Sequence, residues 1–146
     1  MPSARRNRII AAPAQELWEV IADPHHLPRW WPRVARVEAV AGNAFTEVMK
    51  TAKGKSVRAD FELVEADEAA RSLRWEQRLE GTPFARLLSA AHTRVSLQEA
   101  DGGTNVTIEL HQTLSGLLPR LGSLLVRRAA AATIEEALDG LERISG

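Results

Sequence analysis

The stretch RIIAAPAQELWEVIADPHHLPRWWPRV, residues 8–34, contains a short apolar run, a proline and then the pattern of an amphipathic helix. The run predicts a first strand that stops at Pro13, and proline suits the first turn of a helix. Four apolar residues follow at helical spacing: Ala14, Leu17, Trp18 and Ile21. Asp23 precedes a proline, which disfavours helical backbone and ends this helix. The prolines around Trp30 and Trp31 then predict a second short helical turn.

The segments after this stretch alternate between apolar and charged residues, which is typical of antiparallel strands that bury one face. ARVEAVAG (35–42) and NAFTEVMK (43–50) predict two strands joined in a hairpin at Gly42-Asn43. KSVRADFELVEA (55–66) and SLRWEQRLE (72–80) predict two more strands. Their inward residues are Val57, Ala59, Phe61 and Leu63 in the first and Leu73, Trp75, Gln77 and Leu79 in the second.

Two further apolar segments, residues 85–100 and 105–114, predict a final hairpin. Gly102-Gly103 suits a two-residue loop, because glycine adopts the positive φ angles that such loops require. That loop would pair Val95 with Leu110 and Leu97 with Ile108 on the inward face, and Arg94 with His111 on the outward face.

The predicted order is a strand, two short helices, about six strands and a helix from about Leu118 to Ile144. About 27 residues at 1.5 Å rise give a helix of about 40 Å. A sheet with one solvated face must cover its other face, and only this helix is long enough to do so. The sequence therefore predicts an α+β fold in which a curved antiparallel sheet of about six to seven strands wraps around the C-terminal helix.

Composition narrows the class of protein. A chain of 146 residues fits a single domain, residues 1–146, with a real core. The 19 basic and 19 acidic residues give zero net charge, which argues against nucleic-acid binding. No apolar run is long enough to span a membrane, and no signal peptide is recognisable. The absence of cysteine excludes disulfides and cysteine-ligated zinc. A cytoplasmic protein without a cofactor is expected, with its oligomeric state left open.

Continued to Val40, the opening stretch resembles the start of the START-like (SRPBCC) superfamily. The shared pattern is an apolar strand, Ala-Pro, a helix containing Leu-Trp, then Asp and a Trp-Pro turn. The most similar branch is the polyketide cyclase/dehydrase and lipid transport family. Gly103-Thr104 before the last strand and the long final helix fit the same resemblance. It implies a helix-grip fold with an apolar cavity between sheet and helix, and a Trp30-Trp31-Pro32 turn that caps the cavity and seats the second helix on the sheet.

The inward residues are the candidates for lining such a cavity, although they could equally fill a solid core. Those expected to bind a ligand are Trp31, Phe45, Met49, Phe61, Trp75, Gln77, Phe84, Val95, Ile108, Leu110, Leu121 and Leu125. Gln112 and Thr93 share the inward face. Glu47 has the same strand parity as Phe45, and a buried carboxylate there would be a functional candidate because burial raises its pKa.

The histidines give no clear catalytic or metal signal. His25 and His26 are adjacent and point about 100° apart on a helical turn, so they suit solvent or capping better than one metal ion. His92 and His111 fall at outward positions, where solvation or cross-strand pairing is expected. The alternative is that a bulge turns His92 inward, where it would be a polar anchor for a ligand. No Ser/His/Asp spacing or phosphate loop is present, and no metal site is predicted.

Three functions remain open. The first is binding or transport of a small hydrophobic molecule, such as a lipid, an isoprenoid or a polyketide-like compound. The second is a polyketide aromatase/cyclase, which needs a positioned acid or base; the chain has no Tyr or Cys and no convincing inward His. The third is a protein-interaction domain, as in chaperone-activator relatives, which predicts a large exposed patch.

The C-terminal helix presents a conflict between its halves. Ala131, Ile134, Leu138 and Leu141 form one stripe that leads back through Arg127. The apolar residues of the first half lie on another side of the helix: Leu117, Leu118, Leu121, Leu124 and Leu125. Burying an unpaired guanidinium would be costly. Either the helix bends or changes register between Gly122 and Arg128, or its first half forms an exposed gate or partner-facing patch, or Arg127 enters the cavity and pairs with Glu47 or an anionic ligand.

Overall fold

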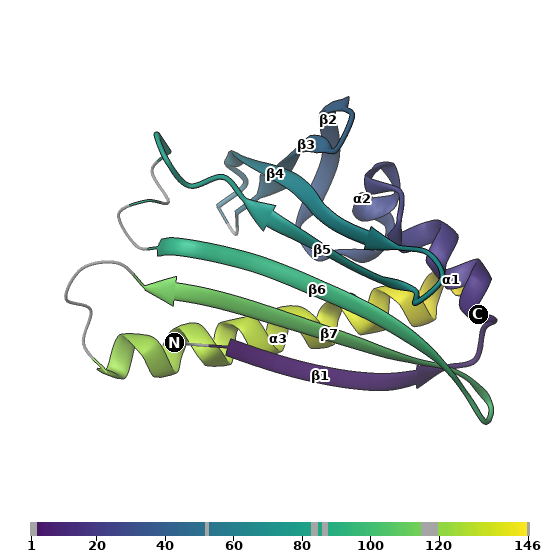
Figure 1. The fold of residues 1–146 in the computed structure, drawn as a ribbon. Helices are drawn as coiled ribbons and strands as arrows, with labels where there is room; N and C mark the ends of the chain where they lie inside the picture. Colours follow the sequence, from purple (N-terminus) through teal and green to yellow (C-terminus); the bar gives the residue numbers. More distant parts are fainter. Residues whose placement is uncertain (1–2, 52, 83–84, 86–87, 115–119, 146) are drawn as a thin grey trace.

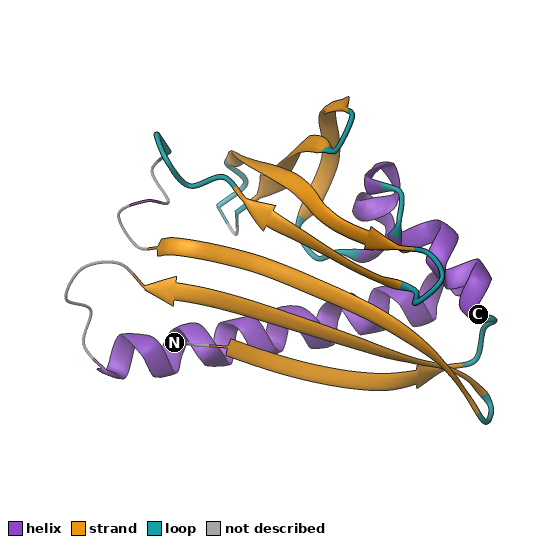
Figure 2. Cartoon of the chain, viewed as in Figure 1, coloured by secondary structure: helices purple, strands orange, loops and turns teal. Residues whose placement is uncertain are grey.

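The computed structural model describes residues 3–51, 53–82, 85, 88–114 and 120–145. Within these residues an antiparallel sheet has the strand order β1-β7-β6-β5-β4-β3-β2, and one long helix packs against it (Figures 1 and 2). The strands are β1 (Ser3–Ile10), β2 (Val34–Ala41), β3 (Ala44–Lys50), β4 (Ser56–Asp67), β5 (Ser72–Gln77), β6 (Leu88–Ala100) and β7 (Gly103–Leu114). The helices are α1 (Ala14–Ile21), the 3₁₀ turn η1 (Pro24–His26), α2 (Leu27–Trp30) and α3 (Arg120–Ser145). This is the expected helix-grip fold.

The segment between β1 and β2 folds as its prolines predict. Pro13 precedes α1 with extended backbone, and Ala14, Leu17, Trp18 and Ile21 are buried. The Asp23 carboxylate accepts a hydrogen bond from the backbone N–H of His25 at 3.0 Å and so caps η1. The His25 ring is exposed, and its Nδ1 lies 2.8 Å from Asp23 Oδ1. The exposed His25 therefore pairs with the Asp23 cap, whereas His26 is half-buried and its side chain makes no capping hydrogen bond.

Strand alternation is confirmed in β4 and β5. Leu73 and Trp75 are buried, whereas Glu76 is exposed. In β4, Ala59 is buried between the exposed Arg58 and Asp60. Phe61 and Trp75 both border a pocket that Thr133 of α3 also lines, so they face the helix side of the sheet as predicted.

The pairing expected for the last hairpin is wrong by two residues. The loop is Asp101-Gly102, so Val95 pairs with Ile108, Leu97 with Val106, Arg94 with Glu109 and His92 with His111. Gly102 supplies the positive φ of the turn at 86°. Gly103 is needed for a different reason, because a Cβ there would lie 2.0 Å from the carbonyl oxygen of Ile10. A shift of two residues preserves the side-chain faces, so the inward set of both strands survives the error.

Helix α3 packs against β1 and β7, and its buried stripe contains Ala130, Ile134, Ala137, Leu138 and Leu141. Helix α2 packs against α3 as well as against β2, so the tryptophan turn is seated on the helix and not only on the sheet. The contact is close because residue 140 is a glycine: a Cβ at this position would lie only 2.2 Å from the Trp30 carbonyl oxygen.

The conflict within the helix is resolved by exposure. Helix α3 is continuous from Arg120 to Ser145, and a bend near residues 122–128 stays a prediction. Arg127 is exposed, so its entry into the cavity and its pairing with Glu47 are wrong. Leu124 and Leu125 are 41% and 56% exposed, which agrees with an apolar surface on the first half of the helix. Leu117, Leu118 and the side chain of Leu121 lie outside the described residues.

Candidate ligand pocket

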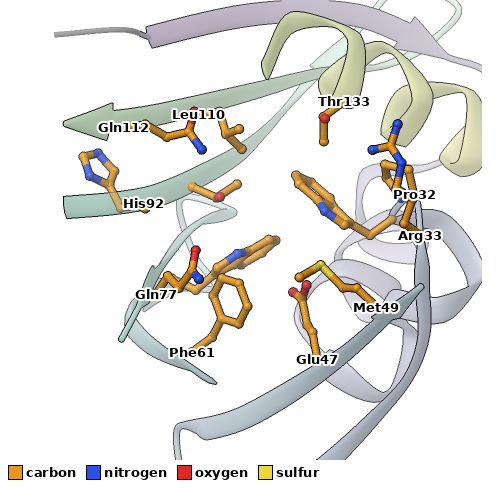
Figure 3. A pocket seen from close by; sticks show the side chains of 14 residues that line it. Pro32, Arg33, Glu47, Met49, Phe61, Gln77, His92, Leu110, Gln112 and Thr133 are labelled. Atoms are coloured by element: carbon orange, nitrogen blue, oxygen red, sulfur yellow. The ribbon is translucent and has the colours of Figure 1, made fainter. Parts of the chain in front are cut away.

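A pocket of about 200 Å³ lies between the sheet and α3 (Figure 3). Helix α3 contacts the β1 and β7 edge of the sheet, and the strands toward β3 curve away from it (Figure 1). The pocket occupies that gap. Its walls come from the turn after α2, from β3 to β7 and from α3, and consist of Trp31, Pro32, Arg33, Glu47, Met49, Phe61, Trp75, Gln77, Ala91, His92, Thr93, Leu110, Gln112 and Thr133.

Aromatic rings that pack on one another form one wall. Trp31 and Trp75 meet edge to face with centroids 5.7 Å apart, and Phe45 stacks on Phe61 at 5.6 Å. Phe45 also meets Trp75 edge to face at 6.5 Å. Such contacts are the geometries that aromatic pairs favour. The rings therefore hold one another in place and give the pocket a firm apolar surface.

Polar side chains from four elements converge on the same space. Gln77 of β5, Thr93 of β6 and Gln112 of β7 line the pocket from the sheet, and Thr133 lines it from α3. Figure 3 shows the amides of Gln77 and Gln112 directed toward the pocket. Neither amide has a hydrogen-bond partner among the described residues, whereas the Thr133 hydroxyl donates to the Ala129 carbonyl at 3.0 Å. These amides are available to a bound molecule.

Glu47 is the only carboxyl group among the described residues that line this pocket. It lies in the middle of β3, paired with Val37 of β2 and Ala59 of β4, and it is 2% exposed. In the described part of the chain its carboxyl makes no hydrogen bond or ion pair. Burial raises its pKa to about 8, because a low-dielectric surrounding disfavours the charged form. The group is therefore mostly protonated at neutral pH.

Arg33 lies at the rim of the pocket. Its backbone has a φ of 65°, which is uncommon outside glycine and clusters at functional sites. Its exposed guanidinium lies 3.6 Å from the Glu136 carboxylate of α3. This ion pair joins the tryptophan turn to the helix across the edge of the pocket.

His92 borders the pocket and stacks on His111, with ring centroids 4.6 Å apart. The two histidines are directly paired across β6 and β7. The cross-strand alternative from the sequence is thus confirmed, although the partner expected for His111 was Arg94. Burial lowers the pKa of His92, and the neighbouring His111 lowers it further.

Of the residues expected to bind a ligand, half border this pocket: Trp31, Met49, Phe61, Trp75, Gln77 and Leu110. Phe45 packs behind Phe61 and borders a neighbouring pocket. Val95 and Ile108 are fully buried in the core cluster that contains Ile134 and Leu138, so they fill the core and do not line the pocket. Leu125 is exposed on α3, away from the lining. Phe84 and the side chain of Leu121 lie outside the described residues.

The other residues that line the pocket differ in how clearly the sequence indicated them. Glu47, Thr93 and Gln112 were recognised by their inward parity, which indicated their face of the sheet but not their access to a cavity. Thr133 lies beside the buried stripe of α3, next to Ile134. Arg33 gave no periodic signal, because it lies in a turn between elements.

Within the residues that the structure describes, no helix is both long and apolar enough to cross a membrane. The same residues contain no cluster of three or more His, Asp or Glu side chains suited to a metal ion.

Comparisons with known proteins agree on the fold. A START superfamily protein from Mycobacterium smegmatis superposes with a TM-score of 0.78 at 14% identity, covering 98% of this chain and 96% of that chain. The Zhui aromatase/cyclase from a Streptomyces species gives 0.80 at 16% identity, covering 98% and 92%. A Thermus thermophilus protein gives 0.74 at 25% identity, covering 97% and 95%. No curated protein matches the chain significantly.

The sequence also matches a family profile over residues 1–146, described as polyketide cyclase / dehydrase and lipid transport. This match assigns the chain: it has the helix-grip fold of the START superfamily protein, and it belongs to the polyketide cyclase/dehydrase and lipid transport family.

Proposed function

We propose that the protein binds a small, mostly apolar ring compound in the pocket between β3–β7 and α3. The observation that carries this proposal is a cavity with an aromatic wall, faced by two amides that have no hydrogen-bond partner among the described residues. Ligand sites are typically apolar clefts with a few placed polar groups. The family description supports the same class of ligand, since it covers both polyketide cyclases and lipid transport.

The size of the pocket favours a compact ligand. A volume of about 200 Å³ holds about seven water molecules at ~30 Å³ each and lies below the ~300–1,000 Å³ of most ligand sites. A compound of roughly one or two fused rings fits this space better than a lipid with a long chain. A partner-protein function is less favoured, because it requires no internal space.

Binding of 2-naphthol, measured by isothermal titration calorimetry, tests the proposal. Leu110 borders the pocket, so Leu110→Trp should fill it and weaken binding at least tenfold. Val64 is an exposed residue of β4, and Val64→Trp is the matched control that should bind like the wild type. Equal melting temperatures of the two variants would exclude a folding effect. Unchanged binding by Leu110→Trp would contradict this site, and no binding by the wild type would contradict the ligand class.

Catalysis on such a compound is a second candidate, favoured by one observation. Acid–base catalysis requires a positioned group whose pKa lies near the working pH, and burial raises the pKa of Glu47 to about 8. Turnover of a bound ketone that falls in Glu47→Gln at unchanged affinity would support it.

A further inference from the structure

We propose that Glu47 is the polar anchor of the pocket in its protonated form, donating its carboxyl hydrogen to a carbonyl oxygen, so that the preferred ligand is a neutral ring ketone. This inference rests on the proposed function, because it names the ligand class of the same site. It adds a residue role and a ligand chemistry to that proposal.

Among the residues that the structure describes, the Glu47 carboxyl has no hydrogen-bond or ion-pair partner. Its position in β3, between β2 and β4, fixes the backbone on both sides, and the side chain is 2% exposed. Figure 3 shows its carboxyl beside Met49, on the opposite side of the pocket from Leu110 and Gln112. Within the described residues no donor or acceptor satisfies it. A buried carboxyl without a hydrogen-bond partner destabilises the protein. A ligand that forms this hydrogen bond therefore removes that cost and binds more tightly.

The charges around the pocket do not neutralise an ionised Glu47. On the rim, the Arg33 guanidinium is engaged with Glu136 of α3 and is exposed. From β6, His92 has a lowered pKa because of its burial, so it is neutral at pH 7. Helix α3 contributes Thr133, and the linings from β4, β5 and β7 are uncharged. The charge state follows from this setting, since burial raises the pKa of Glu47 to about 8, which leaves roughly 90% of it protonated at pH 7.

A protonated carboxyl selects among ligand groups. It donates a hydrogen bond to a carbonyl oxygen, and Gln77 and Gln112 can donate to further oxygens. An ammonium group would require Glu47 to ionise first. A carboxylate would add a second acidic group where the described lining offers a cation only at the rim. A neutral carbonyl on a ring therefore fits both the charge state and the aromatic wall.

Three compounds with the same ring frame separate these possibilities: indane, 1-indanone and 1-aminoindane. Their dissociation constants would be measured by calorimetry at pH 6 and pH 9. We expect 1-indanone to bind the wild type at least tenfold more tightly than indane at pH 6. At pH 9 its affinity should fall about tenfold, because about nine-tenths of Glu47 is then ionised. 1-Aminoindane should bind no better than indane at pH 6.

Variants assign the preference to Glu47. Glu47→Gln should retain the preference for 1-indanone at both pH values, because an amide also donates a hydrogen bond and does not titrate. Glu47→Leu should reduce the ratio of the two affinities to about one. Glu62 is exposed in the neighbouring strand, and Glu62→Gln is the matched control that should behave like the wild type. The ratio is taken within each variant, so general changes in the pocket cancel.

Other results would overturn the inference in distinguishable ways. Equal binding of indane and 1-indanone by the wild type would remove the role of Glu47 and leave the proposed function standing. A preference for 1-aminoindane that grows from pH 6 to pH 9 would instead make Glu47 a counter-ion for amines. Failure of all three compounds and of 2-naphthol to bind would overturn the proposed function and this inference together.

Discussion

Glu47 borders the pocket, and its burial also lowers the stability of the folded protein at the pH values where the carboxyl ionises. Its pKa is raised by burial to about 8, whereas in an unfolded chain a glutamate titrates near 4.3. Between these values the folded protein binds more protons than the unfolded chain, so stability falls as pH rises through this window. The contribution of Glu47 is fully present below about pH 4.3 and is lost as pH rises through 8.

Replacing this single carboxyl should therefore change how stability depends on pH. Relative to Glu47→Gln, the wild type should lose about 3–4 kcal/mol of unfolding free energy between pH 5 and pH 8, at 1.36 kcal/mol per unit. Urea unfolding across that range measures both proteins. Glu62→Gln, an exposed control, should follow the wild type. Parallel curves for the wild type and Glu47→Gln would mean that the carboxyl is not buried in the folded protein.

At the scale of elements, a close approach of α2 and α3 shapes the end of the pocket. Trp30 is 2% exposed, and its backbone lies against Gly140 of α3. The next residue, Trp31, enters the pocket wall. The contact between the helices thus determines where the aromatic wall begins.

Gly140→Ala tests this contact, because two effects oppose each other. Alanine favours a helix over glycine by about 1 kcal/mol, but its Cβ would lie 2.2 Å from the Trp30 carbonyl oxygen. Overpacking of this kind costs about 1–3 kcal/mol, so we expect a net loss of stability and weaker 2-naphthol binding. Thermal unfolding and calorimetry measure the two effects. Ala132 is exposed on α3, and Ala132→Gly should cost about 1 kcal/mol without affecting binding. A stabilised Gly140→Ala variant would show that the helices are further apart.

For the whole molecule, an ion-pair network fastens the first strand to the last helix. The Arg8 guanidinium of β1 lies 2.6 Å from Asp139, 2.7 Å from Glu142 and 2.7 Å from Glu135, all on α3. Hydrogen bonding to Asp139 contributes most to raising the pKa of Arg8. The network joins residues more than a hundred positions apart in the sequence and holds the edge strand β1 against α3.

Arg8→Met keeps much of the side-chain stem and removes the charge. Single exposed ion pairs contribute about 0–1 kcal/mol, so a network of three should contribute about 1–2 kcal/mol at low salt. The loss should shrink in 1 M NaCl, where charges are screened. Urea unfolding at both salt concentrations would measure it, with the exposed Arg5→Met as the control. A loss independent of salt would indicate packing of the stem as the cause.

Much of the architecture was predictable because periodicity reports which face a side chain occupies. The alternation in β4 and β5, the hairpin at Gly42-Asn43 and the helical stripe of Ile134, Leu138 and Leu141 were all confirmed. The pairing of β6 with β7 was not, since two adjacent glycines each fit the loop. Only the approach of β1 to Gly103 distinguishes them.

The sequence by itself determined the order of elements, the inward faces and the family resemblance, because strand and helix periods are local properties of the chain. The tertiary structure alone decided which inward residues face open space. Val95 and Glu47 have the same kind of inward position, yet one is packed in the core and the other borders a pocket. The difference arises from the curvature of the sheet and from the strands on which α3 rests, since depth beneath a helix depends on contacts between distant segments.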